Sequence, residues 1–223
     1  MDSLRKTSII VGLLFVIATA STLLSIFGFW PIYEADYLTL VAANEISMLA
    51  GALLLLTLAA SAVGIPIALY PILKKQNESM ALGYIAARMF EAIFAVFGVI
   101  NLVAILSLSH EFVNAAAPVV SFFETSGALL LAAFEWSSIL LDVPFMLSAL
   151  LLNYLLYKSK LVPKWLSLWG FIGALVYVGY MFSEFFLHLP LMEVFAAPLG
   201  IQEMILAAWL IIKGFNSSGI TLD

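Results

Sequence analysis

The sequence contains no cysteine, only two histidines and few charged residues among its 223. Without cysteine the chain can form no disulfide, no thiolate nucleophile and no cysteine-ligated metal or cluster. Two histidines, His110 and His188, are too few for a histidine-rich metal site, so we expect no metal and no cofactor. Nine Lys and Arg against fourteen Asp and Glu give a net charge of −5, which offers no basic surface for nucleic acid.

Hydrophobic residues, by contrast, make up 64% of the chain, and charged residues only 10%. An ordinary soluble domain carries roughly half apolar and a quarter charged residues. A chain of this length cannot bury such an excess in one water-soluble core, because its surface must still be solvated. The composition therefore excludes a soluble enzyme, a nucleic-acid-binding protein and a disordered chain, and it predicts an integral membrane protein whose main partner is the lipid bilayer.

Crossing the hydrocarbon core takes about 20 predominantly apolar residues, and six such segments can be placed. We predict an all-α polytopic membrane protein in which residues 1–223 form a single domain, a bundle of six transmembrane helices. We expect the first segment to be retained rather than cleaved as a signal peptide, because no site of small residues closes it. The longest predicted loop covers residues 110–124. The predicted helices are residues 8–29, 45–70, 80–109, 125–157, 165–187 and 195–212.

The loops of this predicted bundle differ sharply in charge. Three of them contain no Lys or Arg, and they hold the acidic residues Glu34, Asp36, Glu111 and Glu193. Short loops rich in Lys and Arg stay in the cytoplasm, so both termini are predicted to be cytoplasmic, in a multi-pass protein of the cytoplasmic (inner) membrane. The basic residues that lie on this predicted inner side are Arg5, Lys6, Lys74, Lys75, Lys158, Lys160, Lys164 and Lys213.

Several charged residues fall inside the predicted membrane helices, where each costs about 2.5–3.5 kcal/mol on the insertion scale. Arg88 and Glu91 are spaced i, i+3 and so share one helix face. At about 1.5 Å per residue they lie some 12 and 16 Å from Met80, near mid-membrane. Glu203 lies ten residues before Lys213, at a similar depth.

Two further carboxylates, Glu135 and Asp142, are seven residues apart and share a face of the fourth predicted helix. Arg88 is the only basic residue at this depth, and one guanidinium cannot neutralise four carboxylates. The surplus indicates a carboxyl group that is protonated, hydrated or paired with a cation, because burial and neighbouring carboxylates both raise a carboxyl pKa. The alternative is an ion pair that only orients and packs the helices. The candidate polar cluster is Arg88, Glu91, Glu135, Asp142 and Glu203.

A second polar set lies toward the predicted outer side and consists of Asn44, Glu45, Glu184 and His188. Glu184 and His188 are spaced i, i+4, which places both on one helix face. The spacing lacks the second histidine of a zinc-protease motif, and a simple interfacial salt bridge explains it as well. Small residues that permit close helix contacts are Gly12, Gly51, Gly98, Gly127, Gly170 and Gly173.

Five stretches together resemble a prokaryotic family of six-helix membrane proteins, domain-of-unknown-function family 4386. The most specific stretch is the closing one, from Gln202-Glu203-Met204 through Trp209 to Lys213-Gly214-Phe215. The resemblance covers nearly the whole chain and implies a six-span membrane protein, but it implies no activity. The other stretches are residues 43–45, 70–74, 82–91 and 161–170.

Three functions follow from these observations as hypotheses. The leading one is transport of a small solute or cation, with proton coupling as one form of it, in which Arg88 fixes Glu91 and Glu203 while Glu135 or Asp142 titrates. The second is a non-transporting scaffold or regulatory subunit with a purely structural polar cluster. The third is an intramembrane enzyme acting on lipid through Glu45, Glu184 and His188. No catalytic residue is assigned, and homo-oligomerisation is left open.

Overall fold

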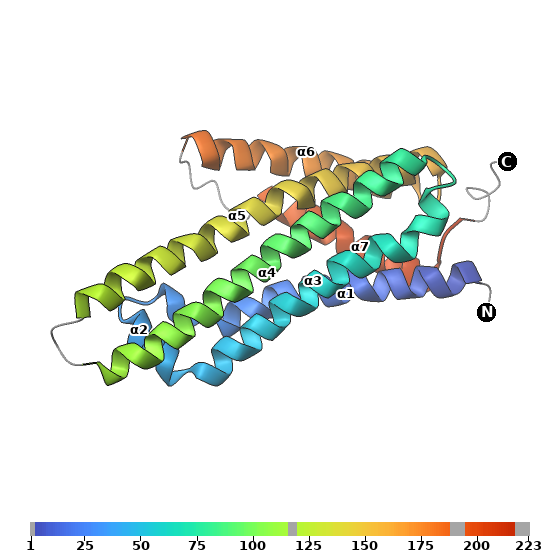
Figure 1. Cartoon of the computed structure of the whole chain (residues 1–223). Coiled ribbons are helices and arrows are strands. Elements are labelled where there is room, and N and C mark those ends of the chain that lie inside the picture. The colour runs from blue at the N-terminus through green and yellow to red at the C-terminus, as the bar shows by residue number, and fades with distance from the viewer. Residues whose placement is uncertain (1–2, 116–119, 188–194, 217–223) are drawn as a thin grey trace. The chain divides into compact units, whose positions relative to one another are not determined.

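The computed structural model describes residues 3–115, 120–187 and 195–216, with side chains left undescribed in 184–187. Within these residues the fold is helical throughout (Figure 1). Four helices precede the second half of the chain: α1 (Ser3–Gly28), α2 (Tyr37–Ala43), α3 (Glu45–Leu73) and α4 (Glu78–Asn114), with a short 3₁₀ helix η1 (Trp30–Tyr33) between α1 and α2. Three more follow: α5 (Val120–Ser159), α6 (Lys164–Leu187) and α7 (Ala197–Ile212).

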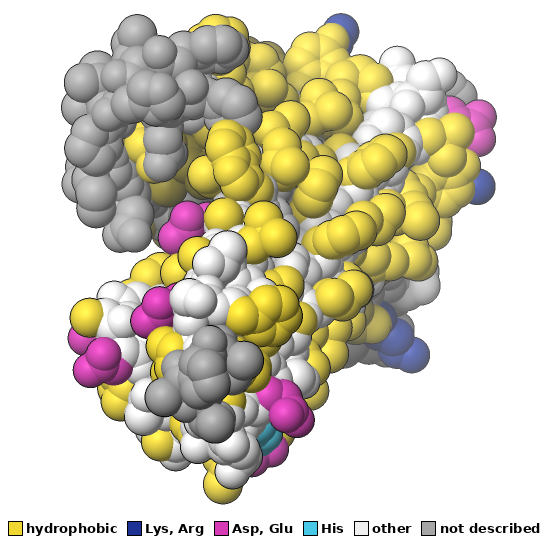
Figure 2. Space-filling view, turned by 60° about the vertical axis from the view of Figure 1, so that its left-hand side comes forward, with side chains coloured by type: hydrophobic (Ala, Val, Ile, Leu, Met, Phe, Trp, Pro, Cys, Tyr) yellow, Lys and Arg dark blue, Asp and Glu magenta, His cyan; other side chains and the backbone are white. Residues whose placement is uncertain are grey.

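Five of these helices are long and apolar enough to cross a membrane: α1, α3, α4, α5 and α6. Large hydrophobic side chains project from their surfaces, including Phe27 at 74% exposure and Leu129 at 72%. Figure 2 shows such side chains exposed along the helices. Surfaces this apolar are rare on soluble monomers and are expected in contact with lipid. The chain is therefore an integral helical membrane protein, as its composition predicts.

The predicted helices all exist, but their ends and connections differ from expectation. The predicted outer loop at residues 110–124 is largely helical, because α4 continues to Asn114 and α5 begins at Val120. The first predicted outer loop folds into η1 and α2, and it buries Ile32 and Val41. Pro31 favours this start because a proline in the first turn of a helix loses no hydrogen bond.

The chain divides into two compact units by its internal contacts. The first unit comprises Met1–Thr19, Ser61–Phe90 and Val143–Asp223, and the second comprises Ala20–Ala60 and Glu91–Asp142. All nine Lys and Arg belong to the first unit, whereas the second unit carries eight Asp and Glu and no Lys or Arg. The single-domain organisation stays a prediction.

In the first unit, α1 and α7 run antiparallel. The Arg5 guanidinium, at the start of α1, donates hydrogen bonds to the carbonyl oxygens of Leu210, Ile211 and Ile212 at the end of α7. A cation there satisfies carbonyls that the helix leaves free and opposes its dipole. Gly214 then ends the helix, with a φ of 79° that glycine adopts without strain.

The α5–α6 connection lies at the same end of the first unit. Asn216 donates from its backbone N to the carbonyl of Leu161 at 2.8 Å, and from its side chain to the carbonyl of Lys160 at 2.9 Å. The start of α1, the end of α7 and the α5–α6 loop therefore meet at one end, which is rich in Lys and Arg.

Candidate functional site

The first unit contains an ion pair between two helices that is largely enclosed by protein. Arg88, on α4, donates from Nη2 to Oε1 of Glu203, on α7, at 3.3 Å. The Arg88 side chain is 3% exposed and that of Glu203 is 13% exposed. The two residues are 115 positions apart in the sequence, and their pairing joins α4 to α7. Their depth in the membrane stays a prediction.

Three aromatic rings surround the Arg88 guanidinium. Its Cζ lies 5.4 Å from the ring centre of Phe145, 5.8 Å from that of Tyr84 and 5.9 Å from that of Phe15. A cation within about 6 Å of a ring face gains about 0.5–2 kcal/mol, with the larger values where water is excluded. The rings come from α1, α4 and α5, so the guanidinium contacts four helices of the first unit when Glu203 is included.

A second polar contact lies next to the ion pair along α7. Gln202 is fully buried and donates from Nε2 to Oδ1 of Asn153 at 3.3 Å and to the carbonyl of Leu166 at 3.1 Å. Asn153 in turn donates to the carbonyl of Ala149 at 2.9 Å. These bonds tie α7 to α5 and α6. Gly170 makes room for them, because a Cβ there would collide with the Asn153 amide.

The other members of the predicted polar cluster belong to the second unit. Glu91 is buried on α4, one turn beyond Arg88. On α5, Asp142 is partly buried and Glu135 is exposed. Within the first unit the structure thus brings together Arg88 and Glu203, and the four-carboxylate arrangement stays a prediction.

The predicted outer polar set is described only in part. Asn44 closes α2 and donates to the carbonyl of its own helix residue Leu40 at 2.8 Å. Glu45 begins α3, and its Oε2 lies 3.7 Å from Nε2 of His110 on α4. The side chain of Glu184 and all of His188 lie outside the described residues, so their pairing stays a prediction.

Burial changes the pKa of Tyr37, a titratable residue of the second unit that lies on α2. Desolvation raises the pKa of the Tyr37 hydroxyl on α2, and the Glu124 carboxylate raises that pKa further. Both effects keep the phenol neutral across the physiological range. Among the residues that the structure describes, no group of three His, Asp or Glu side chains could hold a metal ion.

Sequence reasoning missed the aromatic rings around Arg88 and the amide contact of Gln202 beside the ion pair. Tyr84 could have been found, because it precedes Arg88 by one turn and shares its face. Gln202 is the neighbour of Glu203 and was equally visible. Phe15 and Phe145 carried no signal, because the chain has 17 Phe and nothing in an apolar helix marks which of them faces a charge.

Comparison with known proteins gives one match. The model of a family described as Domain of unknown function (DUF4386) matches residues 10–214. No curated protein and no solved structure matches the chain.

Proposed function

This chain belongs to the DUF4386 family, and we propose that it is a six-span protein of a prokaryotic cytoplasmic membrane that moves a small solute or cation. In this proposal Glu203 is the group that exchanges partners, and Arg88 is the internal cation that holds it when no solute is bound. The supporting observation is the unequal exposure of the pair, 13% for Glu203 against 3% for Arg88. Glu203 is therefore the less enclosed member of the pair, and in this proposal it is the one that a proton or a small cation reaches.

The physical basis is the cost of a buried ion pair. Removing both charges from water costs several kcal/mol per ion, and their attraction only roughly compensates this. Glu203 can therefore exchange Arg88 for another partner at little cost. When Glu203 binds a proton or a competing cation, the ion pair breaks, and the three rings still hold the guanidinium in place. Intramembrane ionisable residues are functional candidates for this reason.

A sixth crossing by α7 is part of the proposal. The helix has 16 residues and is about 24 Å long, somewhat short of the roughly 30 Å hydrocarbon core. The contacts of Arg5 bring its end beside the start of α1. After five crossings the end of α6 would lie on the side of the membrane opposite to Arg5. The end of α7 lies beside Arg5, which supports a sixth crossing by α7.

Cysteine labelling tests the proposed orientation and the crossing by α3, because the chain has no cysteine of its own. We propose that the ends rich in Lys and Arg, with both termini, face the cytoplasm. In intact spheroplasts, a membrane-impermeant maleimide is expected to label Ala35→Cys, between η1 and α2, and to label Ser79→Cys, at the start of α4, only after permeabilisation. Both positions are exposed. The reverse pattern would overturn the orientation, and labelling of both in intact spheroplasts would overturn the proposed crossings.

Transport is tested by flux into liposomes. We expect purified protein to pass protons, Na⁺ or K⁺ down an imposed gradient, followed with a pH-sensitive dye or radiolabelled cations, and Glu203→Gln to abolish that flux. Glu78→Gln is the matched control, because Glu78 is an exposed carboxylate at the start of α4. Glu91→Gln, Glu135→Gln and Asp142→Asn form the remaining arms. Flux that is unchanged in all four variants would remove the transport proposal.

The second candidate is a non-transporting scaffold or regulatory subunit. The observation that favours it is the enclosure of Arg88 by three rings. Together with the Glu203 contact, these rings link four helices, and this link does not require Glu203 to change partners. In that case the ion pair contributes to stability and specificity of packing, and no cation gradient drives flux through the purified protein.

A further inference from the structure

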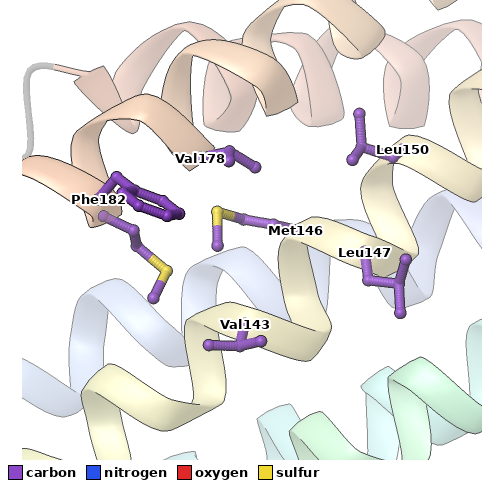
Figure 3. A pocket seen from close by; sticks show the side chains of 7 residues that line it. Val143, Met146, Leu147, Leu150, Val178 and Phe182 are labelled. Carbon is purple, nitrogen blue, oxygen red and sulfur yellow. The ribbon is translucent and has the colours of Figure 1, made fainter. Parts of the chain in front are cut away.

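An apolar groove lies between α5 and α6 in the first unit (Figure 3). On α5 it is lined by Val143, Met146, Leu147 and Leu150. Their spacing of i, i+3, i+4 and i+7 places all four on one face of the helix. The groove is distinct from the ion pair, and among the residues that the structure describes only apolar side chains line it.

The α6 wall has the same character. It consists of Val178, Met181 and Phe182, again on one helix face. Met146 and Met181 are buried, and their flexible thioethers adapt to an occupant of irregular shape. Leu147 and Phe182 are 52% and 65% exposed, so the groove opens to the outside of the unit.

The size and chemistry of the groove discriminate among occupants. Its volume is about 380 Å³. Water gains nothing there, because a stable water needs two or more polar partners. A helix from a second copy is about 10 Å across, so this volume would hold less than one turn of it. A flexible hydrocarbon chain, by contrast, is thin enough to lie along the groove.

The groove is continuous with the surface that faces the bilayer. An exposed apolar side chain, Leu175, continues the α6 wall one turn before Val178. Acyl chains are what surrounds such a surface in a membrane protein. We propose that the groove is a binding site for one acyl chain of a membrane lipid, held longer than the lipids around the rest of the surface.

The depth of the groove identifies the leaflet. Leu150 lies eight residues before Lys158, about 12 Å along α5, and Phe182 lies 18 residues after Lys164, about 27 Å along α6. Measured from the basic ends, the groove thus spans about 12 to 27 Å of a core of about 30 Å, and most of its lining lies beyond the midpoint. The lipid belongs to the leaflet opposite the basic ends. This inference requires the bilayer but not transport, so it stands or falls separately from the flux assay.

Photocrosslinking tests the site on the unmodified full chain. The protein is reconstituted in vesicles of phosphatidylethanolamine and phosphatidylglycerol, doped with phosphatidylcholine that carries a diazirine in one acyl chain. After irradiation, adducts are mapped by mass spectrometry. We expect several-fold more adducts at Leu147 than at Ile172, a matched position because the two side chains are 52% and 51% exposed.

A filled groove provides the decisive comparison. Val178→Trp is expected to lower adducts at Leu147 to the level seen at Ile172, and Leu150→Phe serves the same purpose if the first variant does not fold. Equal adducts at Leu147 and Ile172 in the unmodified chain, or unchanged adducts at Leu147 in a folded filled variant, would show bulk lipid only and overturn the site. Disulfide-linked dimers of Leu147→Cys would overturn it in favour of a second copy.

Discussion

Arg88→Ala is expected to lower the free energy of unfolding by about 3–5 kcal/mol, because it leaves the buried Glu203 carboxylate without its cation. The substitution also opens a cavity between the rings of Phe15, Tyr84 and Phe145, which adds the loss of packing to the loss of charge. The measurement is the thermal unfolding midpoint of the purified protein in detergent, where a drop of many degrees should appear.

The double variant Arg88→Gln with Glu203→Gln is the control that isolates the charge. Replacing both members of a buried ion pair is often neutral, whereas removing one is strongly destabilising. The double variant should therefore melt well above Arg88→Ala. If instead it melts as low as Arg88→Ala, the stability resides in the ring contacts of the guanidinium and not in the pairing of charges.

Combining this result with the flux assay separates the two candidate functions. A double variant that is stable but carries no cation flux, beside an active unmodified protein, is the result expected of an exchange site. A stable double variant beside an unmodified protein that never carries flux is the result expected of a scaffold. Stability alone cannot make this distinction, because both functions need α4 and α7 to be joined.

Much of the fold was predictable because hydrophobic length is a strong signal. All six predicted segments are helical where the structure describes them, and α3 begins at Glu45 as predicted. The turns at the outer side were not predictable in the same way. Residues 110–114 and 120–124 are helical although His110, Glu111 and Glu124 look like loop residues, because helices extend beyond the apolar core with no change in their backbone hydrogen bonding.

The candidate site was predictable only in its charged members. Arg88 and Glu203 stand out because a charge in an apolar segment is costly, and the structure pairs the two side chains. Which faces meet was harder to infer. Helices that are apolar all round carry little periodicity, so the rings that enclose Arg88, and the division of the carboxylates between two units, could not be inferred from spacing.

The same limit applied to helix packing, where one member of a glycine pair was identified and the other was not. Gly51 was predicted as a close-contact residue of α3, and the structure places it against Gly28, the last residue of α1. Ser47, one turn earlier on α3, donates from Oγ to the carbonyl of Gly28 at 2.9 Å. Two backbones approach closely in membranes where small residues face each other and a hydroxyl bridges them.

Gly28→Ala should therefore be among the most destabilising methyl additions in the second unit. A Cβ at Gly28 would lie 2.6 Å from the backbone N of Gly51 and 3.0 Å from the carbonyl O of Ser47, so α1 and α3 must separate. Overpacking of this kind costs about 1–3 kcal/mol. Backbone atoms cannot move aside as a flexible side chain can, so we expect Gly28→Ala to lower the free energy of unfolding by an amount near the upper end of this range. The thermal unfolding midpoint in detergent measures it.

Two matched substitutions show whether the expected destabilisation by Gly28→Ala comes from the helix contact or from the loss of glycine itself. At Gly51 the added Cβ would lie 3.1 Å from Cα of Gly28, so Gly51→Ala should destabilise less than Gly28→Ala. Gly179 is exposed on α6 with nothing within 4 Å of an added Cβ, and Gly179→Ala should be neutral or stabilising by up to about 1 kcal/mol through helix propensity. Equal midpoints for Gly28→Ala and Gly179→Ala would mean that α1 and α3 do not cross at this distance in the membrane protein.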